Sequence, residues 1–305
     1  MKFHTHIPMD LIEPTGEFQT GQAVSEMARA VEAAGIAAAY VTDHPAPSAD
    51  WLHNDPTGHD ALDPFTALAF IAAATTRLKV MTQVLVLPYR NPFLTAKAAA
   101  TLQTLSGGRF VMGVGVGYQK IEFEALGVAF NQRGALTDEA LETIRLAWAG
   151  GAVIKEGRHF NAVGNEPRPI PKRAPPIWIG GGSDKAVERA ALWGEGWTPF
   201  LSLPTDNEYV KASWVKDTAD LGRKIEHITA RRAELGRSGA FDISTASPVP
   251  LQALSASEAE RFLESVQQLA QLGVTWVAAD LPAPSRGAYI DNLRWFGETI
   301  IPRCS

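Results

Sequence analysis

Residues 175–200, PPIWIGGGSDKAVERAALWGEGWTPF, contain the pattern that decides the fold class. Pro176–Ile179 is a short apolar run typical of a buried strand, and Gly196–Phe200 is a second such run. Between them, a glycine turn leads into a segment with helical spacing that begins near Lys185. This order predicts a strand, a helix and a parallel strand, which is the repeating unit of α/β proteins.

The same alternation extends toward both ends of the chain. Most of the strand-like runs are apolar throughout, as expected for parallel strands that are buried on both faces. Eight strands separated by helical segments predict a (β/α)8 barrel (TIM barrel), and a doubly wound open sheet is the alternative. The six further strands are expected at Lys2–Ile7, Ala38–Thr42, Lys79–Val86, Arg109–Gly115, Phe241–Ala246 and Val274–Ala278.

Length and composition favour one large domain. Of 305 residues, 46% are hydrophobic and 20% are charged, so the chain can bury a core. We expect a single barrel over residues 1–305, because barrels of about 250 residues form one domain. Two polar stretches, residues 44–60 and 151–175, interrupt the alternation after the second and fourth strands. Loops that follow barrel strands lie on the catalytic face, so we expect long functional loops there.

Charge and cysteine usage exclude several classes of protein. The net charge of −5 argues against binding to a nucleic acid backbone. The single cysteine, Cys304, excludes an intrachain disulfide and a cysteine metal cluster. No apolar run reaches the roughly 18 residues of a membrane span, and the N-terminus does not resemble a signal peptide. We therefore expect a cytoplasmic protein that acts on a small molecule.

Two glycine-rich runs are candidates for phosphate binding. Gly113–Gly117 fails the dinucleotide fingerprint because its third glycine position is occupied by Tyr118. Gly180–Ser183 follows a strand and precedes a helix, where backbone N–H groups and the helix dipole favour an anion. An ordinary tight turn explains the second run equally well.

Histidines on two predicted strands are candidates for acid–base catalysis or metal binding. Asp43 and His44 close the second strand, where a histidine oriented by a carboxylate can act as acid or base. His4 and His6, two apart on the first strand, face the same side and suggest a metal site. Later strands supply no further histidine, so we expect no metal, and His6 is expected to contact an organic group in the pocket.

The chain resembles the luciferase-like monooxygenase superfamily, and particularly its coenzyme F420-dependent oxidoreductase branch. The resemblance rests on the order and spacing of several segments, together with Asp43-His44 and residues 175–200. These segments are DPFTALAFIAAATTRLKV (63–80), LPYRNPFLTAKAAATLQTLSGGRF (87–110), GVGVGYQKIEFEALGVAFNQRG (113–134) and DEALETIRLAW (138–148).

The resemblance implies a flavin or 5-deazaflavin across the C-terminal end of the barrel. The family places a backbone bulge, often with a non-proline cis peptide, at Gln83-Val84 behind the ring. His44 matches the active-site histidine of the F420-dependent sugar-phosphate dehydrogenases, and Gly180–Ser183 matches the phosphate site of the cofactor. Those dehydrogenases carry an acid where this chain has Tyr118, so a sugar phosphate is not the expected substrate, and Tyr118 is a candidate hydrogen-bond donor to substrate.

The leading hypothesis is an oxidoreductase that exchanges hydride between coenzyme F420 and a small organic substrate. The alternatives are an FMN-dependent monooxygenase, a non-catalytic flavin-binding protein and a metal-dependent hydrolase. The resemblance also implies a homodimer formed through barrel helices. The residues expected to act in catalysis are His44, Asp43 and Tyr118, and those expected at the cofactor are His6, Asp43, Gln83, Val84, Gly117, Gly180, Gly181, Gly182 and Ser183.

Overall fold

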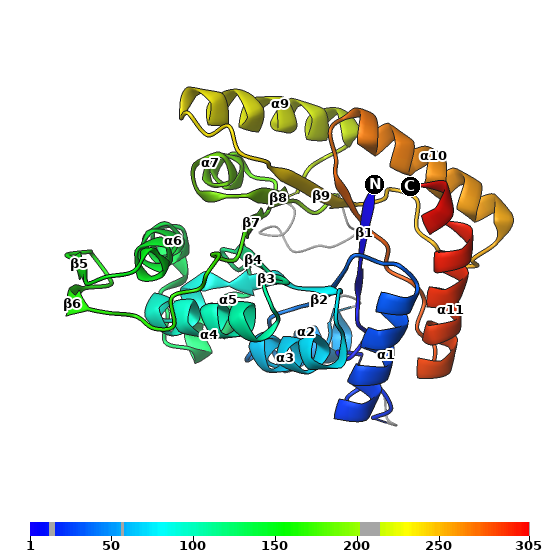
Figure 1. Ribbon diagram of the computed structural model, residues 1–305, viewed down its shortest axis with the longest axis horizontal. Helices are drawn as coiled ribbons and strands as arrows, with labels where there is room; N and C mark the ends of the chain where they lie inside the picture. The colour runs from blue at the N-terminus through cyan, green and yellow to red at the C-terminus, as the bar shows by residue number, and fades with distance from the viewer. Residues whose placement is uncertain (12–15, 56–57, 202–213, 305) are drawn as a thin grey trace.

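The computed structural model describes residues 1–11, 16–55, 58–201 and 214–304 (Figure 1). Eight parallel strands close into a barrel in the order β1-β10-β9-β8-β7-β4-β3-β2. The first strand pairs with both β2 and β10, which completes the ring. The (β/α)8 barrel expected from the sequence is therefore confirmed, and the open-sheet alternative is wrong.

Seven of the eight predicted strand-like runs contain a whole barrel strand, and the eighth, Pro176–Ile179, overlaps β7, which ends one residue later at Gly180. The runs extend beyond the strands by at most two residues. The strands are β1 (Lys2–His6), β2 (Ala38–Val41), β3 (Lys79–Val86), β4 (Phe110–Gly115), β7 (Ile177–Gly180), β8 (Gly196–Thr198), β9 (Asp242–Ala246) and β10 (Trp276–Ala278).

The longer helices surround the barrel (Figure 1). Many begin at a side chain that accepts a backbone hydrogen bond, such as Asp63 before α3 and Ser183 before α7. These helices are α1 (Gly21–Ala33), α3 (Pro64–Ala74), α4 (Pro92–Leu105), α6 (Arg133–Ala149), α7 (Asp184–Trp193), α9 (Thr218–Glu234), α10 (Ala256–Gln271) and α11 (Arg286–Thr299). Shorter helical segments are α2 (Ala49–Asn54), α5 (Lys120–Ala125) and the 3₁₀ turns η1 (Leu87–Tyr89), η2 (Phe130–Gln132) and η3 (Ile301–Arg303).

Two hydrophobic clusters pack on opposite faces of the strands. The larger cluster lies between the strands and the helices, where apolar positions of both elements meet. The smaller cluster includes Tyr40, Met81, Trp178 and Trp276, which alternate along their strands with residues of the larger one. The interior of the barrel is thus filled with side chains, and space for ligands is left at its ends.

The two polar stretches that interrupt the alternation of strands and helices differ in structure. Residues 151–175 carry an antiparallel pair of strands, β5 (Val153–Lys155) and β6 (Ala162–Asn165), which projects from the barrel at the left of Figure 1. These two strands were not expected from the sequence. Residues 44–60 contain α2, whose Trp51 is buried. None of the helices in the described ranges combines the length and apolar character needed to cross a membrane.

Candidate active site

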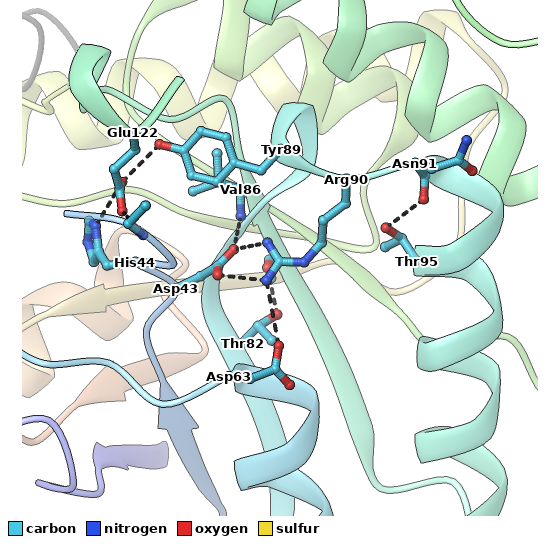
Figure 2. Close-up of polar contacts among 12 residues, drawn as sticks. Asp43, His44, Asp63, Thr82, Val86, Tyr89, Arg90, Asn91, Thr95 and Glu122 are labelled. Carbon is cyan, nitrogen blue, oxygen red and sulfur yellow. Dashed lines mark hydrogen bonds and ion pairs between the residues drawn. The ribbon is translucent and has the colours of Figure 1, made fainter. Parts of the chain in front are cut away.

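His44 lies just beyond the end of β2, beside a buried carboxylate from α5. Its Nδ1 atom is 3.2 Å from Oε2 of Glu122, a residue with no exposed surface (Figure 2). The same oxygen accepts a hydrogen bond from the Tyr89 hydroxyl at 2.9 Å, and Oε1 accepts one from the backbone N–H of Ala46. Glu122 therefore fixes the His44 ring and leaves its Nε2 atom for a ligand.

Asp43 points away from His44. Its carboxylate accepts hydrogen bonds from both terminal nitrogens of Arg90, at 2.7 and 2.9 Å, and from the Val86 backbone N–H at 2.9 Å (Figure 2). Burial raises the pKa of Asp43, while Arg90 and the Val86 N–H act in the opposite direction. The expectation that Asp43 orients His44 is wrong, because its oxygens are bound by Arg90 and Val86 and Glu122 holds the imidazole.

Aromatic rings surround the other faces of His44. Trp51 from α2 lies 4.5 Å away, His59 lies 4.9 Å away and Tyr118 lies 6.0 Å away, each measured between ring centroids. Burial raises the pKa of Tyr118 to about 12, and the charge of Glu122 adds to the shift. Tyr118 is thus a neutral hydrogen-bond donor near the imidazole, as a substrate contact requires.

The two histidines of β1 have separate environments. His4 is fully buried and contacts Ser244 Oγ through Nε2 at 2.7 Å, and burial lowers its pKa to about 3. His6 lies at the barrel mouth, with Nε2 3.0 Å from Oδ2 of Asp10. Burial alone would lower the pKa of His6, but the carboxylates of Asp10 and Asp280 outweigh it and raise the pKa.

No metal site emerges from these histidines. Among the residues that the structure describes, no three His, Cys, Asp or Glu side chains converge as ligands. His4 and His6 bind different partners at different depths of the barrel, so the two rings do not share a ligand. The geometry gives the metal-dependent hydrolase hypothesis no support.

The third strand carries the bulge that the family resemblance implies. The Gln83-Val84 peptide bond is cis, and the pairing of β3 with β4 shifts register between Thr82 and Leu85. The Val84 side chain packs against neighbouring glycines: a Cβ on Gly115 would lie 2.7 Å from Val84 Cγ2, and one on Gly180 would lie 2.9 Å from Cγ1. These glycines make room for the bulge.

The Gly180–Ser183 turn has both packing and binding features. A Cβ on Gly182 would lie 2.7 Å from backbone atoms of Trp214 and Val215, so this glycine is needed for packing. Gly181 has φ +94° and only Ala186 Cβ nearby, at 3.5 Å. The Ser183 hydroxyl caps α7 by accepting from the Ala186 N–H.

A small cavity of about 40 Å³ lies at this end of α7. Its lining includes Gly181, Ser183, Thr137 and Arg189, whose guanidinium also binds Asp138. Helix N–H groups beside a guanidinium are suited to an anion such as a phosphate.

The structure brings some of the expected site residues together, and it adds site residues that were not expected. His44 and Tyr118 lie together, and Gln83 and Val84 form the bulge. Gly117 has φ +76° and packs against Val86 and Phe123. Glu122, Arg90 and His59 were not expected in the site from the sequence. The only available signal for Glu122 was an acid among apolar residues in the segment IEFEAL.

The comparisons with known proteins agree with this geometry. The luciferase-like monooxygenase model matches residues 1–297. An uncharacterized protein from Mycobacterium bovis is 29% identical over 295 residues, covering 91% of this chain and 94% of that protein. The F420-dependent glucose-6-phosphate dehydrogenase of Nocardia farcinica is 30% identical over 212 residues, covering 67% of this chain and 61% of that enzyme.

Two solved structures share the whole fold. The monooxygenase RslO1 from Streptomyces bottropensis superposes with a TM-score of 0.80 at 18% identity and covers all of both chains. An F420-dependent secondary alcohol dehydrogenase, in complex with an F420-acetone adduct, has a TM-score of 0.78 at 16% identity, covering 100% of this chain and 99% of that one. The barrel architecture is therefore that of luciferase-like enzymes.

The chain belongs to the luciferase-like monooxygenase family. Enzymes of this family are F420- or flavin-dependent oxidoreductases and monooxygenases, and this protein is an enzyme of that kind. The F420-dependent relatives support the branch that the strand-end histidine and the sequence segments indicated.

Proposed function

We propose that this protein is an oxidoreductase that transfers hydride between coenzyme F420 and a small organic substrate. The observation that carries the proposal is the His44–Glu122 pair at the C-terminal end of the barrel, in a chain whose third strand carries the Gln83-Val84 bulge. A histidine held by a buried carboxylate is suited to exchange a proton with a substrate oxygen. The deazaflavin, when bound, supplies the hydride chemistry.

Orphaned polar groups and the glycine cradle support a site for such a cofactor. Gln83 Oε1 and Thr198 Oγ1 are buried without a hydrogen-bond partner among the described residues. Buried polar atoms normally have partners, so these atoms are suited to the polar edge of a bound ring. At the N-terminus of α7, Gly181 and Arg189 are placed to hold a phosphate. The residues present fit a cofactor with a polar ring and a phosphate-bearing tail.

The residues around the reacting centre have different roles. His44 exchanges the proton at Nε2, because Nδ1 is held by Glu122. Asp43 acts with Arg90 to fix the chain after β3. It therefore helps to position the Gln83-Val84 bulge and does not take part in proton exchange. Tyr118 donates a hydrogen bond to the substrate, and the buried Trp51 keeps water from one face of His44.

The second candidate is an FMN-dependent monooxygenase. The fold and the orphaned polar atoms suit either cofactor, and the high structural similarity to the monooxygenase RslO1 favours keeping this alternative. The Asp43-His44 strand end and the F420-dependent relatives favour F420.

Equilibrium binding of the purified protein to F420 and FMN, measured side by side, distinguishes the two candidates. We expect F420 to bind more tightly. Tenfold tighter binding of FMN, about 1.4 kcal/mol in the opposite direction, would make the monooxygenase the leading function.

We also propose that the protein is a homodimer, and that α3 and α4 form the contact. Helix α3 has no charged residue and exposes Phe70, which is 53% accessible. On α4, Leu94 and Leu105 are 69% and 76% accessible and lie on one face, three helical turns apart. Exposed apolar surface on adjacent helices is typical of an interface.

Light scattering tests the dimer. The wild-type protein is expected at twice the chain mass and Leu94→Glu at the chain mass. A monomeric wild-type protein would refute the proposal.

A further inference from the structure

Trp197 of β8 holds the backbone of the glycine turn that leads into α7. Its indole Nε1–H donates a hydrogen bond to the Gly181 carbonyl oxygen at 2.8 Å. Trp197 is fully buried, so water does not compete for this contact. The hydrogen bond therefore fixes the direction in which the Gly181 carbonyl points.

Without such a bond, the peptide that joins Gly181 to Gly182 would turn easily. Rotation of a peptide plane changes ψ of the residue before it and φ of the residue after it, and glycine tolerates a wide range of both angles. Gly181 already has φ +94°, and the next residue is again a glycine. The orientation of this peptide therefore depends on its hydrogen bonds and not on side-chain sterics.

The Trp197 contact also sets the direction of the Gly182 N–H. The peptide bond between the two glycines is trans, and in a trans peptide the C=O and N–H groups point in opposite directions. A carbonyl held by Trp197 thus directs the N–H away from β8. The cavity of about 40 Å³ lies on that other side, because its lining comes from β4, α6, β7 and α7, and β7 separates β4 from β8 in the barrel.

Two backbone amides at this turn have no acceptor within the described ranges. The N–H groups of Gly182 and Ser183 donate to no described backbone or side-chain group, whereas the Ser183 hydroxyl accepts from Ala186. Backbone N–H groups normally have a partner, so two unpaired amides beside a helix N-terminus are suited to an anion. Arg189 also lines the cavity and adds a guanidinium, which it shares with Asp138.

We propose that Trp197 is a positioning residue for the phosphate of the cofactor. By holding the Gly181 carbonyl, it keeps the Gly182 N–H directed at the phosphate and keeps the carbonyl oxygen, which would repel an anion, turned away. Trp197 acts only through this peptide. The inference deepens the proposed function and rests on its phosphate site, but not on the choice between F420 and FMN, since both carry a phosphate.

Ligand pairs with and without a phosphate test the proposal on the full-length protein. Dissociation constants are measured for FMN with riboflavin, and for F420 with the deazaflavin that lacks the phosphate-bearing tail. The ratio of the two constants in a pair gives the contribution of the phosphate or its tail. Trp197→Phe keeps an aromatic ring and removes the N–H, and this ratio is expected to fall by about 2- to 10-fold. Affinity for the ligand without phosphate is expected to stay unchanged.

Trp148→Phe is the matched control. Trp148 is also a buried tryptophan whose indole donates to a backbone carbonyl, that of Ala96 at 2.9 Å. Its acceptor lies on α4, and Trp148 does not line the cavity at the start of α7. Both substitutions remove the same kind of hydrogen bond and the same side-chain volume. The control is therefore expected to lower the stability of the fold and to leave both ratios unchanged.

An unchanged ratio in Trp197→Phe would overturn the proposal, as would an equal loss of affinity for both members of a pair, which indicates general damage. If Trp197→Phe does not fold, NMR of the ¹⁵N-labelled wild-type protein decides. Inorganic phosphate is expected to shift the Gly182 amide signal and to leave the Trp197 indole signal in place, and an unshifted Gly182 amide would refute the proposal. Tighter binding of FMN than of F420 would remove the F420 function, but the FMN–riboflavin ratio would still test Trp197.

Discussion

Asp43 and Arg90 form a two-point ion pair that joins the end of β2 to the chain after β3. The two N–O distances are 2.7 and 2.9 Å, and the Asp43 side chain is 1% exposed while that of Arg90 is 20% exposed. The Val86 N–H adds a third hydrogen bond to the same carboxylate. Because Tyr89 immediately precedes Arg90 and binds Glu122, this pair also fixes the group that holds His44.

Removal of the Asp43 charge should destabilise the fold. Asp43→Asn leaves the Arg90 guanidinium without its anionic partner, and breaking a buried pair from one side costs about 3 kcal/mol. Urea unfolding of the variant measures the loss. Glu124→Gln is the matched control, because Glu124 forms an exposed pair with Lys120 that is worth less than about 1 kcal/mol. Equal stability of Asp43→Asn and wild type would show that the pair contributes nothing net.

Acid should destabilise the protein through His4. The folded-state pKa of His4 is about 3, below the ordinary value of 6.5, because the ring is buried. Below pH 6.5 the unfolded chain therefore binds a proton that the folded chain does not, and stability falls as the pH falls. At pH 5 the expected loss from this group is about 2 kcal/mol, or 1.36 kcal/mol for each pH unit below the unfolded pKa.

The control for this prediction is His4→Asn. The variant is expected to be less stable at pH 7, because it leaves a gap beside Tyr40 and Trp276, but to lose less stability between pH 7 and pH 5. Urea unfolding of both proteins at the two pH values measures this. If the two proteins lose the same amount, His4 is not the group that titrates.

The barrel could be predicted because its signals are local. Apolar runs such as Lys79–Val86 form strands wherever they are buried on both faces, and the Gly180–Ser183 turn marks a strand-to-helix connection. The cis peptide at Gln83-Val84 followed from the family resemblance alone, because no local residue pattern requires it. The two-residue spacing of His4 and His6 predicted only that both lie on one face of the first strand. It did not predict their separate surroundings.

The partners within the site could not be predicted, because they are far apart in the sequence. Glu122 is 78 residues from His44, and Arg90 is 47 residues from Asp43. The adjacency of Asp43 and His44 suggested that Asp43 orients His44, but Asp43 binds Arg90 and Val86 while His44 binds Glu122. Trp51 and His59 contact each other and His44, which no pattern in the polar sequence around them indicates.

Gly181 should be needed for cofactor binding. Gly181→Val adds a branched side chain at φ +94°, beside the cavity at the start of α7, so it should restrict the backbone and block a phosphate. Binding of F420 is expected to weaken at least tenfold. Gly151→Val is the control, because Gly151 has φ +80° and open space around it, far from the site in the sequence and on the β5 side of the barrel. Equal binding by both variants would place the phosphate elsewhere.

His44 should determine turnover much more than cofactor binding. His44→Asn keeps a polar side chain of modest size but cannot titrate near neutral pH, so it removes proton exchange with limited damage to packing. General acid–base catalysis contributes typically 10²- to 10⁴-fold, and a fall in kcat of that size is expected with cofactor affinity unchanged.

Glu122→Gln keeps the contact to His44 Nδ1 but removes the charge that stabilises the protonated ring, so a smaller fall in kcat is expected. The pH profile of kcat/KM is a second readout, because any limb that His44 imposes disappears in His44→Asn. A His44→Asn enzyme with near-normal kcat and an unaltered pH profile would remove His44 from proton transfer and make Tyr118 the next residue to test.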